Sequence, residues 1–343
     1  MPSRRLATIQ KSTIVRSLGI LERVAPAVGA RWAERLWFTV PRAGGRRDRL
    51  APPGRPFEVR VHGRTVPGET WGDGPPVYLV HGWGGWRGQL DAFAAPLAEA
   101  GHRVVAFDAL GHGDADPGPA GPGRSTALEL ADSLAAVVAA HGPAAAVVAH
   151  SLGATATAYA MGEGLAVGRA VFVAPMADPL PYTGTFARRL GFGERTRGRM
   201  VRRIERRVGM PLSAFRVPDL ARTGATPPLL LVHDRQDAET GWSDSDAIAR
   251  AWPGARLVTT TGLGHRRILR DPAVVAEVAG FVGSLLTSPR LPADGQARTT
   301  RRLSRAGSAA PAMRVPARAS SRSASSSSAV ISSPGTRAGI PGG

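Results

Sequence analysis

From residue 57 onward, short apolar runs alternate with longer segments whose apolar residues recur at helical spacing. The runs predict strands and the longer segments predict helices. Strands are expected over 57–61, 64–71, 77–81, 103–107, 145–150, 169–174, 228–233 and 256–260, and helices over 88–100, 128–141, 152–162, 244–252 and 272–286. This alternation predicts an α/β domain over 57–287, with a mostly parallel sheet covered by helices on both faces. Side chains that carry chemistry are then expected directly after the strands, at their carboxyl ends.

A different pattern precedes this domain. Between residues 12 and 40, apolar residues such as Ile14, Leu18 and Leu21 recur at three- and four-residue spacing, which predicts an amphipathic helix. Pro26 is expected to kink or end this helix, and a second short helical stretch is expected to begin around Trp32. Residues 41–56 are rich in Pro, Gly and Arg and predict a linker, so 1–56 form a separate N-terminal segment. The apolar face either packs on the main domain, which we prefer, or makes a weak contact with an anionic membrane surface.

The positive charge of the chain lies mainly at its two ends. The net charge of +18 divides into +8 over residues 1–50 (11 basic, 3 acidic), +8 over 288–343 (9 basic, 1 acidic) and +2 over 51–287 (24 basic, 22 acidic). A nucleic-acid-binding fold is expected to carry its basic patch on the folded domain, so no specific nucleic-acid partner is predicted. Residues 288–343 are rich in Ser, Ala, Arg, Pro and Gly, and they predict a disordered tail.

Composition narrows the chemistry further. The chain has no cysteine, which excludes disulfides, thiolate metal sites and a cysteine nucleophile. No apolar run approaches the roughly 18 residues of a membrane-spanning helix. The N-terminus lacks the unbroken apolar stretch of a secretory signal, so a cytoplasmic location is predicted.

The strongest chemical candidate is Ser151, in the pentapeptide 149–153 between a predicted strand and a predicted helix. A sharp strand-to-helix turn would hold the serine hydroxyl above the sheet as a nucleophile. Such a turn needs small residues two positions before and two after the serine, and Ala149 and Gly153 meet this need. At position 149 alanine stands where glycine is usual, and its methyl group reduces the space within the turn without blocking it. The alternative is that Ser151 serves only as the N-cap of the helix.

A serine nucleophile needs a base, and the base needs an orienting acid. His265 follows the last predicted strand in a glycine-rich loop and is the predicted base, with a solvated loop histidine as the alternative. Two carboxylates follow the strand 228–233, and we predict Asp237 as the acid because the loop can carry it toward the base. Asp234 is expected to cap the turn or to pair with Arg235. The other histidines near predicted strand ends are expected to be structural: His81, His112 and His150.

Backbone N–H groups are predicted to stabilise the negative oxygen of a tetrahedral intermediate. One is Leu152 N–H at the start of the helix, and the other is Trp83 N–H in the glycine-rich loop 81–85. The alternatives for this loop are a tight turn or a phosphate cradle, and the residues typical of phosphate loops do not follow it. No cofactor and no metal site are predicted.

These residues together resemble the α/β-hydrolase superfamily over about residues 71–287. The resemblance rests on the loop His81-Gly82-Trp83-Gly84-Gly85, the segment Asp108-Ala109-Leu110-Gly111-His112-Gly113, the turn at Ser151, Asp237 and His265. It implies an α/β-hydrolase fold and bacterial hydrolases of the esterase, lipase or aminopeptidase kind, with Ser151 as nucleophile, His265 as base and Asp237 as orienting acid. The chain departs from the family pattern at Ala149 and at Asp114-Ala115-Asp116, where a serine often follows Gly-His-Gly.

The expected reaction is hydrolysis of a small-molecule carboxylic ester or related acyl substrate through an acyl-enzyme. A thioesterase or amidase on the same triad, and a retired hydrolase fold acting as a binding or membrane-surface protein, are the alternatives. Residues 178–225 are expected to form a small helical cap over the site. This cap carries 11 Arg and 4 acidic residues. We expect an amphipathic helix with a solvated basic back, the alternative being a lid that attracts anionic substrates.

Overall fold

The computed structural model of the protein describes residues 4–41, 49–223 and 226–287. The predicted tail 288–343 and part of the predicted linker lie outside the described residues. The strands are β1 (Arg55–Val61), β2 (Arg64–Trp71), β3 (Pro76–Val80), β4 (Arg103–Phe107), β5 (Ala144–His150), β6 (Val167–Val173), β7 (Leu229–Asp234) and β8 (Arg256–Thr260). The helices are α1 (Arg4–Val24), α2 (Pro26–Trp37), η1 (Arg87–Phe93), α3 (Ala94–Glu99), α4 (Ala127–His141), α5 (Leu152–Gly162), α6 (Pro179–Leu190), α7 (Glu194–Val208), η2 (Leu212–Phe215), α8 (Val217–Thr223), α9 (Trp242–Ala251), α10 (Gly264–Arg267), η3 (Ile268–Arg270) and α11 (Pro272–Thr287).

The strands form one eight-stranded sheet in the order β1-β2-β4-β3-β5-β6-β7-β8. β2 runs antiparallel to both of its neighbours, β1 and β4, and the remaining pairs from β4 to β8 are parallel. β1 and β2 form a hairpin whose turn residues His62 and Gly63 both have positive φ angles, 51° and 74°. A two-residue turn of this kind matches the right-handed twist of the strands it joins. The predicted α/β fold class is confirmed.

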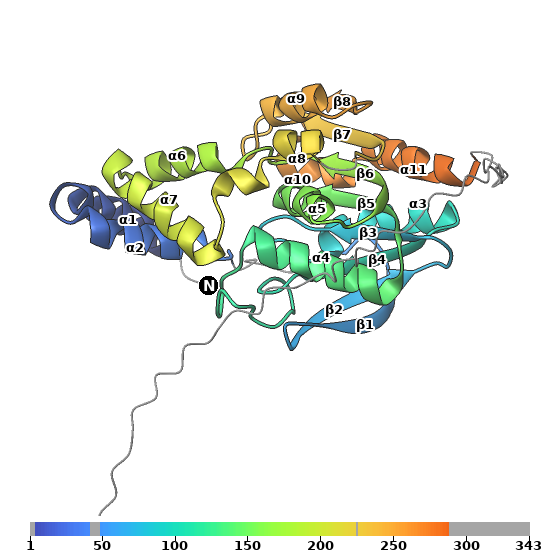
Figure 1. Cartoon of the computed structure of the whole chain (residues 1–343), viewed down its shortest axis with the longest axis horizontal. Helices are drawn as coiled ribbons and strands as arrows, with labels where there is room; N and C mark the ends of the chain where they lie inside the picture. The colour runs from blue at the N-terminus through green and yellow to red at the C-terminus, as the bar shows by residue number, and fades with distance from the viewer. Residues whose placement is uncertain (1–3, 42–48, 224–225, 288–343) are drawn as a thin grey trace, which may run out of the picture. The chain divides into compact units, whose positions relative to one another are not determined.

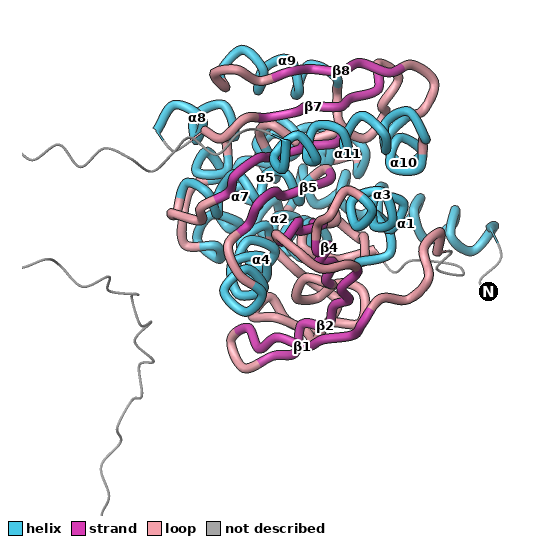
Figure 2. The backbone as a smooth tube through the Cα atoms, turned by 90° about the vertical axis from the view of Figure 1, so that its right-hand side faces the viewer, coloured by secondary structure: helices cyan, strands magenta, loops and turns pink. Residues whose placement is uncertain are grey.

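Each face of the sheet carries its own apolar core. On one face, α4, α5, α8 and α9 bury side chains such as Leu134, Val217 and Ile248. On the other, η1, α3 and α11 bury side chains such as Phe93, Leu97 and Val278. Figure 2 shows the strands between these two helical layers. The central strands are therefore buried on both sides, which explains their continuous apolar runs.

The helix predicted over 88–100 is two elements, the 3₁₀ helix η1 and the α-helix α3. Pro96 explains the break, because proline has no amide hydrogen and is tolerated only in the first turn of an α-helix. α3 therefore begins at Ala94. The same rule moves the start of the second N-terminal helix from the region of Trp32 to Pro26, which occupies the first helical position of α2.

Residues 4–41 form an N-terminal arm that packs on the cap. In Figure 1, α1 and α2 lie beside α6 and α7 of the cap, although more than a hundred residues separate the two pairs of helices in the sequence. Leu18 of α1, Ala33 of α2, and Met200 and Ile204 of α7 are buried together in a third apolar cluster. The cap is not one amphipathic helix as expected. Gly191, with a left-handed φ of 72°, ends α6 and lets α7 begin in a new direction.

Charged side chains also join the arm to the cap. The buried carboxylate of Glu34 accepts hydrogen bonds from Arg207 Nε (2.7 Å) and from Arg203 Nε (2.5 Å). The basic back of the cap is thus only partly solvated: Arg202 and Arg206 are exposed, whereas Arg203 and Arg207 serve as partners of the arm. This pairing corrects the expectation of a fully solvated basic face.

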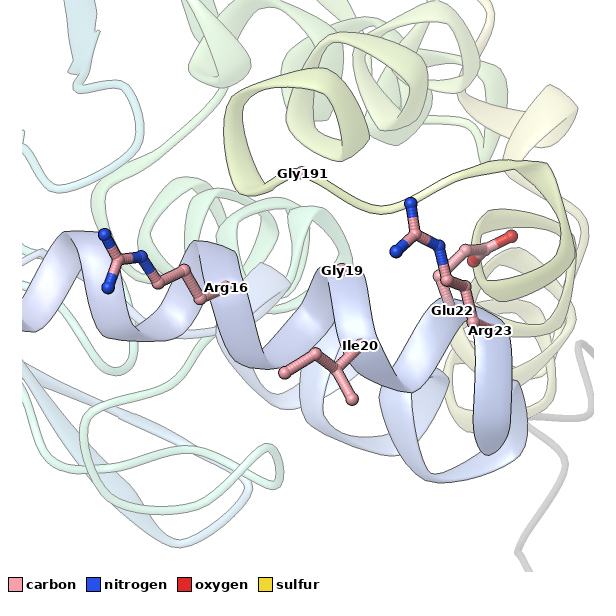
Figure 3. A pocket seen from close by; sticks show the side chains of 6 residues that line it. All are labelled: Arg16, Gly19, Ile20, Glu22, Arg23 and Gly191. Atoms are coloured by element: carbon pink, nitrogen blue, oxygen red, sulfur yellow. The ribbon is translucent and has the colours of Figure 1, made fainter.

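α1 also contacts the segment that joins α6 to α7. Glu22 accepts hydrogen bonds from the backbone N–H groups of Arg195 (3.2 Å) and Thr196 (3.0 Å) in the first turn of α7. A carboxylate at a helix N-terminus satisfies amides that have no partner within the helix. Figure 3 shows Glu22 next to Arg23, two of the residues that line a surface hollow together with Gly19 and Gly191. This hollow shares no lining residue with the cavity at Ser151.

The outer side of the arm keeps three exposed aliphatic side chains: Ile20, Val24 and Val28, which are 60%, 74% and 50% exposed. Among the described residues, no helix is both long and apolar enough to cross a membrane. The inner face of the arm packs on the cap, which lies within the predicted domain 57–287, and not on the helices that cover the sheet. Contact of the arm with an anionic membrane surface stays a prediction.

Candidate active site

Ser151 lies at the turn between β5 and α5, in a conformation that few residues adopt. Its φ and ψ are 53° and −123°, and its side chain makes no capping hydrogen bond to α5. Its hydroxyl is therefore free for another partner, contrary to the N-cap alternative. A Cβ on Gly153 would lie 2.5 Å from the carbonyl oxygen of His81, so glycine is required at that position. Ala149 is fully buried in the core below the turn, so the departure from glycine is accommodated.

The structure brings Ser151, His265 and Asp237 into one hydrogen-bonded chain. His265 Nε2 is 3.1 Å from Ser151 Oγ, and His265 Nδ1 is 2.7 Å from Asp237 Oδ2. A carboxylate can only accept, so Nδ1 carries the hydrogen and Nε2 of the neutral ring is left to accept from the serine hydroxyl. The tautomer set by Asp237 is the one that a base acting on Ser151 requires.

Asp237 is held by more partners than the sequence suggested. Its Oδ1 accepts from the backbone N–H groups of Glu239 (2.7 Å) and Thr240 (3.0 Å), and His233 Nε2 lies 3.4 Å from its Oδ2. Burial raises the pKa of this carboxyl, but the hydrogen bonds from His233 and His265 outweigh it and hold the pKa well below the ordinary 3.8. Asp237 is consequently ionised at neutral pH, as an orienting carboxylate must be.

Asp234 has a different task, close to the expected turn cap. Its Oδ2 accepts from Thr260 Oγ1 (2.8 Å) and from Leu263 N–H (3.0 Å), and its Oδ1 accepts from Gln236 N–H (2.9 Å). It thus ties the end of β7 to the loop that carries His265. Arg235 does not pair with it, and its guanidinium stacks at 3.7 Å over the Trp242 ring.

His150, predicted to be structural, lies directly against His265. Its Nε2–H donates to the backbone carbonyl of His265 (3.0 Å), and the two rings are 4.6 Å apart. Burial lowers the pKa of His150 to about 3, and the neighbouring His265 ring contributes to this lowering. A neutral His150 can support the His265 loop without placing a positive charge beside the His265 ring.

This buried histidine predicts a pH-dependent stability. His150 protonates near 6.5 when unfolded and only near pH 3 when folded, so unfolding takes up a proton between these values. The free energy of unfolding should therefore fall as the pH drops below 6.5, by up to about 1.4 kcal/mol per pH unit from this group. Urea unfolding of His150→Gln between pH 7 and pH 4 should show a shallower decline than the parent protein. Equal slopes for the two proteins would contradict this account.

The loop after β3 faces the same turn. His81 Nδ1–H donates to the carbonyl of Gly82 (2.8 Å), and its Nε2 accepts from Ala109 N–H (3.0 Å), so His81 positions the loop that leads to Trp83. A Cβ on Gly82 would lie 2.9 Å from the Cβ of Ser151, which shows how closely the loop approaches this residue. Trp83 and Leu152 both line the cavity at Ser151.

The Asp108–Gly113 segment supports this loop from below. The Asp108 carboxylate accepts from the backbone N–H of Arg87 (2.6 Å) and of Asp114 (2.8 Å). The Arg87 guanidinium also contacts Asp108, Asp114 and Glu69. Asp114 is one of the residues at which the chain departs from the family pattern, and here it pairs with Arg87.

The chain of Ser151, His265 and Asp237 opens into a cavity of about 690 Å³. Its walls come from three parts of the protein: the loops of the hydrolase domain, the cap, and the end of the arm. Thr240 and Glu239, beside Asp237 in sequence, line it together with Arg266. Over the described residues, no group of three or more His, Asp or Glu side chains is arranged to hold a metal ion.

Sequence reasoning found the three residues of the hydrogen-bonded chain and missed their supports. His233, Thr240 and the arm residues 36–41 were not singled out as parts of the site. The only available signal for His233 was a polar residue at the end of an apolar strand. Nothing local in the sequence marks the arm residues.

Comparison with known proteins agrees with this architecture. A family model described as the α/β hydrolase fold matches residues 75–217, and one described as TAP-like protein matches residues 208–298. The non-heme chloroperoxidase CPO-A1 of Kitasatospora aureofaciens is 40% identical over 53 residues, which cover 14% of this chain and 18% of that protein. The match thus spans less than a fifth of the curated relative.

Two solved structures resemble the fold at low sequence identity. Est816, described as an N-acyl homoserine lactone degrading enzyme, has a TM-score of 0.52 at 18% identity and covers 66% of this chain and 99% of its own. Est1E from Butyrivibrio proteoclasticus, with ferulic acid bound, has a TM-score of 0.53 at 19% identity and covers 67% and 98%. Two family models match the chain, and the order of its sheet and the strand-to-helix turn at Ser151 are consistent with the α/β-hydrolase fold. The protein belongs to the α/β-hydrolase superfamily.

Proposed function

We propose that the protein hydrolyses a carboxylic ester of a small molecule through an acyl-enzyme formed on Ser151. The observation that carries the proposal is the hydrogen-bonded chain from Ser151 Oγ through His265 to Asp237, which opens into a cavity. The pKa of Asp237 is held below its ordinary value, so the carboxylate is ionised and can orient the His265 ring. A retired site would have no reason to keep this chain intact, so the arrangement favours an active enzyme.

In the first half of the reaction, Ser151 Oγ attacks the carbonyl carbon of the ester while His265 Nε2 takes the hydroxyl proton. The ionised Asp237 stabilises the imidazolium that forms. The backbone N–H groups of Leu152 and Trp83 donate to the negative oxygen of the tetrahedral intermediate, and each such donor contributes about 3–4 kcal/mol. The intermediate collapses, and His265 returns the proton to the departing alcohol.

In the second half, a water molecule attacks the carbonyl carbon of the acyl-enzyme. His265 Nε2 now takes a proton from the water, and a second tetrahedral intermediate forms at the same donors. Its collapse releases the carboxylic acid, and the proton on His265 returns to Ser151 Oγ. The enzyme ends in the state in which it began.

The test is covalent labelling of the full-length protein with a fluorophosphonate, followed by identification of the modified peptide. We expect one adduct per chain, on Ser151, and hydrolysis of nitrophenyl acetate and butyrate that the label abolishes. Acyl-thioesters and acyl amides with the same acyl groups test the leaving group. Absence of labelling would refute an active serine nucleophile, and turnover restricted to thioesters or amides would refute the assignment to esters.

A further inference from the structure

The end of the N-terminal arm forms part of the wall of the cavity at Ser151. The arm contributes Leu36, Trp37, Phe38, Thr39 and Pro41 to the lining. These residues precede the segments 75–217 and 208–298 that match the family models. This part of the wall therefore lies outside the segments that match the family models.

The exit of the arm is attached to the hydrolase domain by backbone hydrogen bonds. Val40 N–H donates to the carbonyl of Gly123 (3.0 Å), Ser125 N–H donates to the carbonyl of Phe38 (3.1 Å), and Thr39 pairs with Arg124 in an antiparallel bridge. Residues 123–125 lie directly before α4. Backbone pairing of this kind sets the position of Trp37 relative to the loops of the site.

On the other side, the arm is fixed to the cap. The Trp37 ring meets Phe186 of α6 edge to face, with centroids 5.2 Å apart and planes at 87°. The guanidinium of Arg207, which also pairs with Glu34, lies 5.9 Å from the centre of the buried Phe38 ring. Trp37 is therefore held between core and cap, and its indole is a fixed part of the wall.

The wall that Trp37 belongs to is apolar. Phe186, Ile204 and Val208 of the cap continue the surface that Trp37 begins. Three charged residues also line the cavity. Glu239 and Arg266 pair with each other at 3.2 Å, so their charges offset one another, and Arg189 of α6 donates to the carbonyl of Ala238 at 3.5 Å. A cavity of about 690 Å³ is of the size that buries a drug-sized ligand, far larger than an acetyl group fills.

We infer that the site takes esters with a large apolar group on one side of the scissile bond, and that Trp37 of the arm is a specificity-determining residue for that group. The inference rests on the proposed esterase activity. An apolar chain gains about fourfold in binding for each methylene group it buries. A short ester leaves this wall unused, so kcat/KM should rise with the length of the substrate's apolar group.

The experiment compares two substrate series with the full-length protein: nitrophenyl esters from acetate to decanoate, and acetate esters of alcohols from ethanol to decanol. The two series show whether the acyl or the alcohol side occupies the wall. The variants are Trp37→Ala and the matched control Trp32→Ala. Trp32 lies on the same helix and packs in the cluster between arm and cap, but it does not line the cavity.

The quantity compared is a ratio: kcat/KM for the longest substrate that the parent protein hydrolyses well, divided by kcat/KM for the shortest. We expect Trp37→Ala to lower this ratio by at least about tenfold, since one buried apolar side chain accounts for such a factor. Trp32→Ala should leave this ratio unchanged even if it lowers the melting temperature. Trp37→Leu, which keeps an apolar side chain, covers the case in which the alanine variant does not fold. It should lower the ratio in the same direction but less than Trp37→Ala does, because leucine buries less apolar surface than tryptophan and more than alanine.

The outcomes separate the two proposals. A parent protein that neither reacts with a fluorophosphonate nor hydrolyses any ester would contradict the proposed function itself. An active parent with no length preference in either series would overturn the inference alone. So would a ratio that Trp37 and Trp32 variants change equally, or one that Trp37→Leu leaves as it is.

Discussion

Ser151→Ala is expected to abolish fluorophosphonate labelling and to lower kcat for nitrophenyl esters on the order of a millionfold, the loss seen when a triad loses its serine. The variant removes the only group of the protein that bonds to the substrate carbon in the proposed mechanism. Folding should be unaffected, because the hydroxyl makes no capping bond in α5 and alanine occupies the same turn conformation with a similar strain. Circular dichroism and the melting temperature check this point.

A matched control is Ser213→Ala, an exposed serine in the short helix η2 of the cap. It should keep both labelling and turnover. A Ser151→Ala protein that still reacts with the fluorophosphonate at another residue, or still hydrolyses the ester at a comparable rate, would remove Ser151 from the mechanism.

Asp237→Asn is expected to lower kcat by about 10⁴-fold, since an amide holds the base in the wrong tautomer. The structure gives the reason. Oδ1 accepts two backbone hydrogen bonds, from Glu239 and Thr240, so the asparagine oxygen must take that position. Its NH₂ group then faces His265 Nδ1, which must accept. The hydrogen moves to Nε2, which can no longer take the proton of Ser151.

Asp234→Asn is the matched comparison. Both oxygens of Asp234 accept backbone N–H groups, so an amide NH₂ at either position opposes a donor. The expected effect is a loss of stability of about 1–3 kcal/mol, with a much smaller loss of kcat. Urea unfolding and steady-state kinetics on both variants decide the matter. If Asp234→Asn impairs turnover more than Asp237→Asn does, the acid has been assigned to the wrong carboxylate.

Much of the site could be predicted because each of its main residues stands directly after a strand that the sequence itself predicts. Each of the residues Trp83, Ser151, Asp237 and His265 follows its own strand, and parallel strands bring their carboxyl ends to one edge of a sheet. Glycine at 153 was also readable, since only a residue without a Cβ fits the close approach to the carbonyl of His81. Patterns of this kind depend on a few neighbouring residues and on one rule of topology.

Other features had no local signal. The contact of His150 with the carbonyl of His265 joins residues more than a hundred positions apart, as does the pairing of Glu34 with Arg203. In the sequence, the arginines of the cap resemble a solvated face. Their partner lies in a helix at the far end of the chain, so only the packed structure separates the paired arginines from the exposed ones.

The periodicity of apolar residues along this chain was thus sufficient for the order of strands and helices and the two covered faces of the sheet. The short motifs after the strands then indicated the three residues of the hydrogen-bonded chain. The periodicity also indicated an apolar face on the arm and on the cap, since amphipathicity is a property of each helix alone. Which faces meet depends on shape and charge complementarity between segments distant in sequence. The packing of the arm on the cap, and with it the place of Trp37 in the wall of the cavity, was decided only when the chain folded.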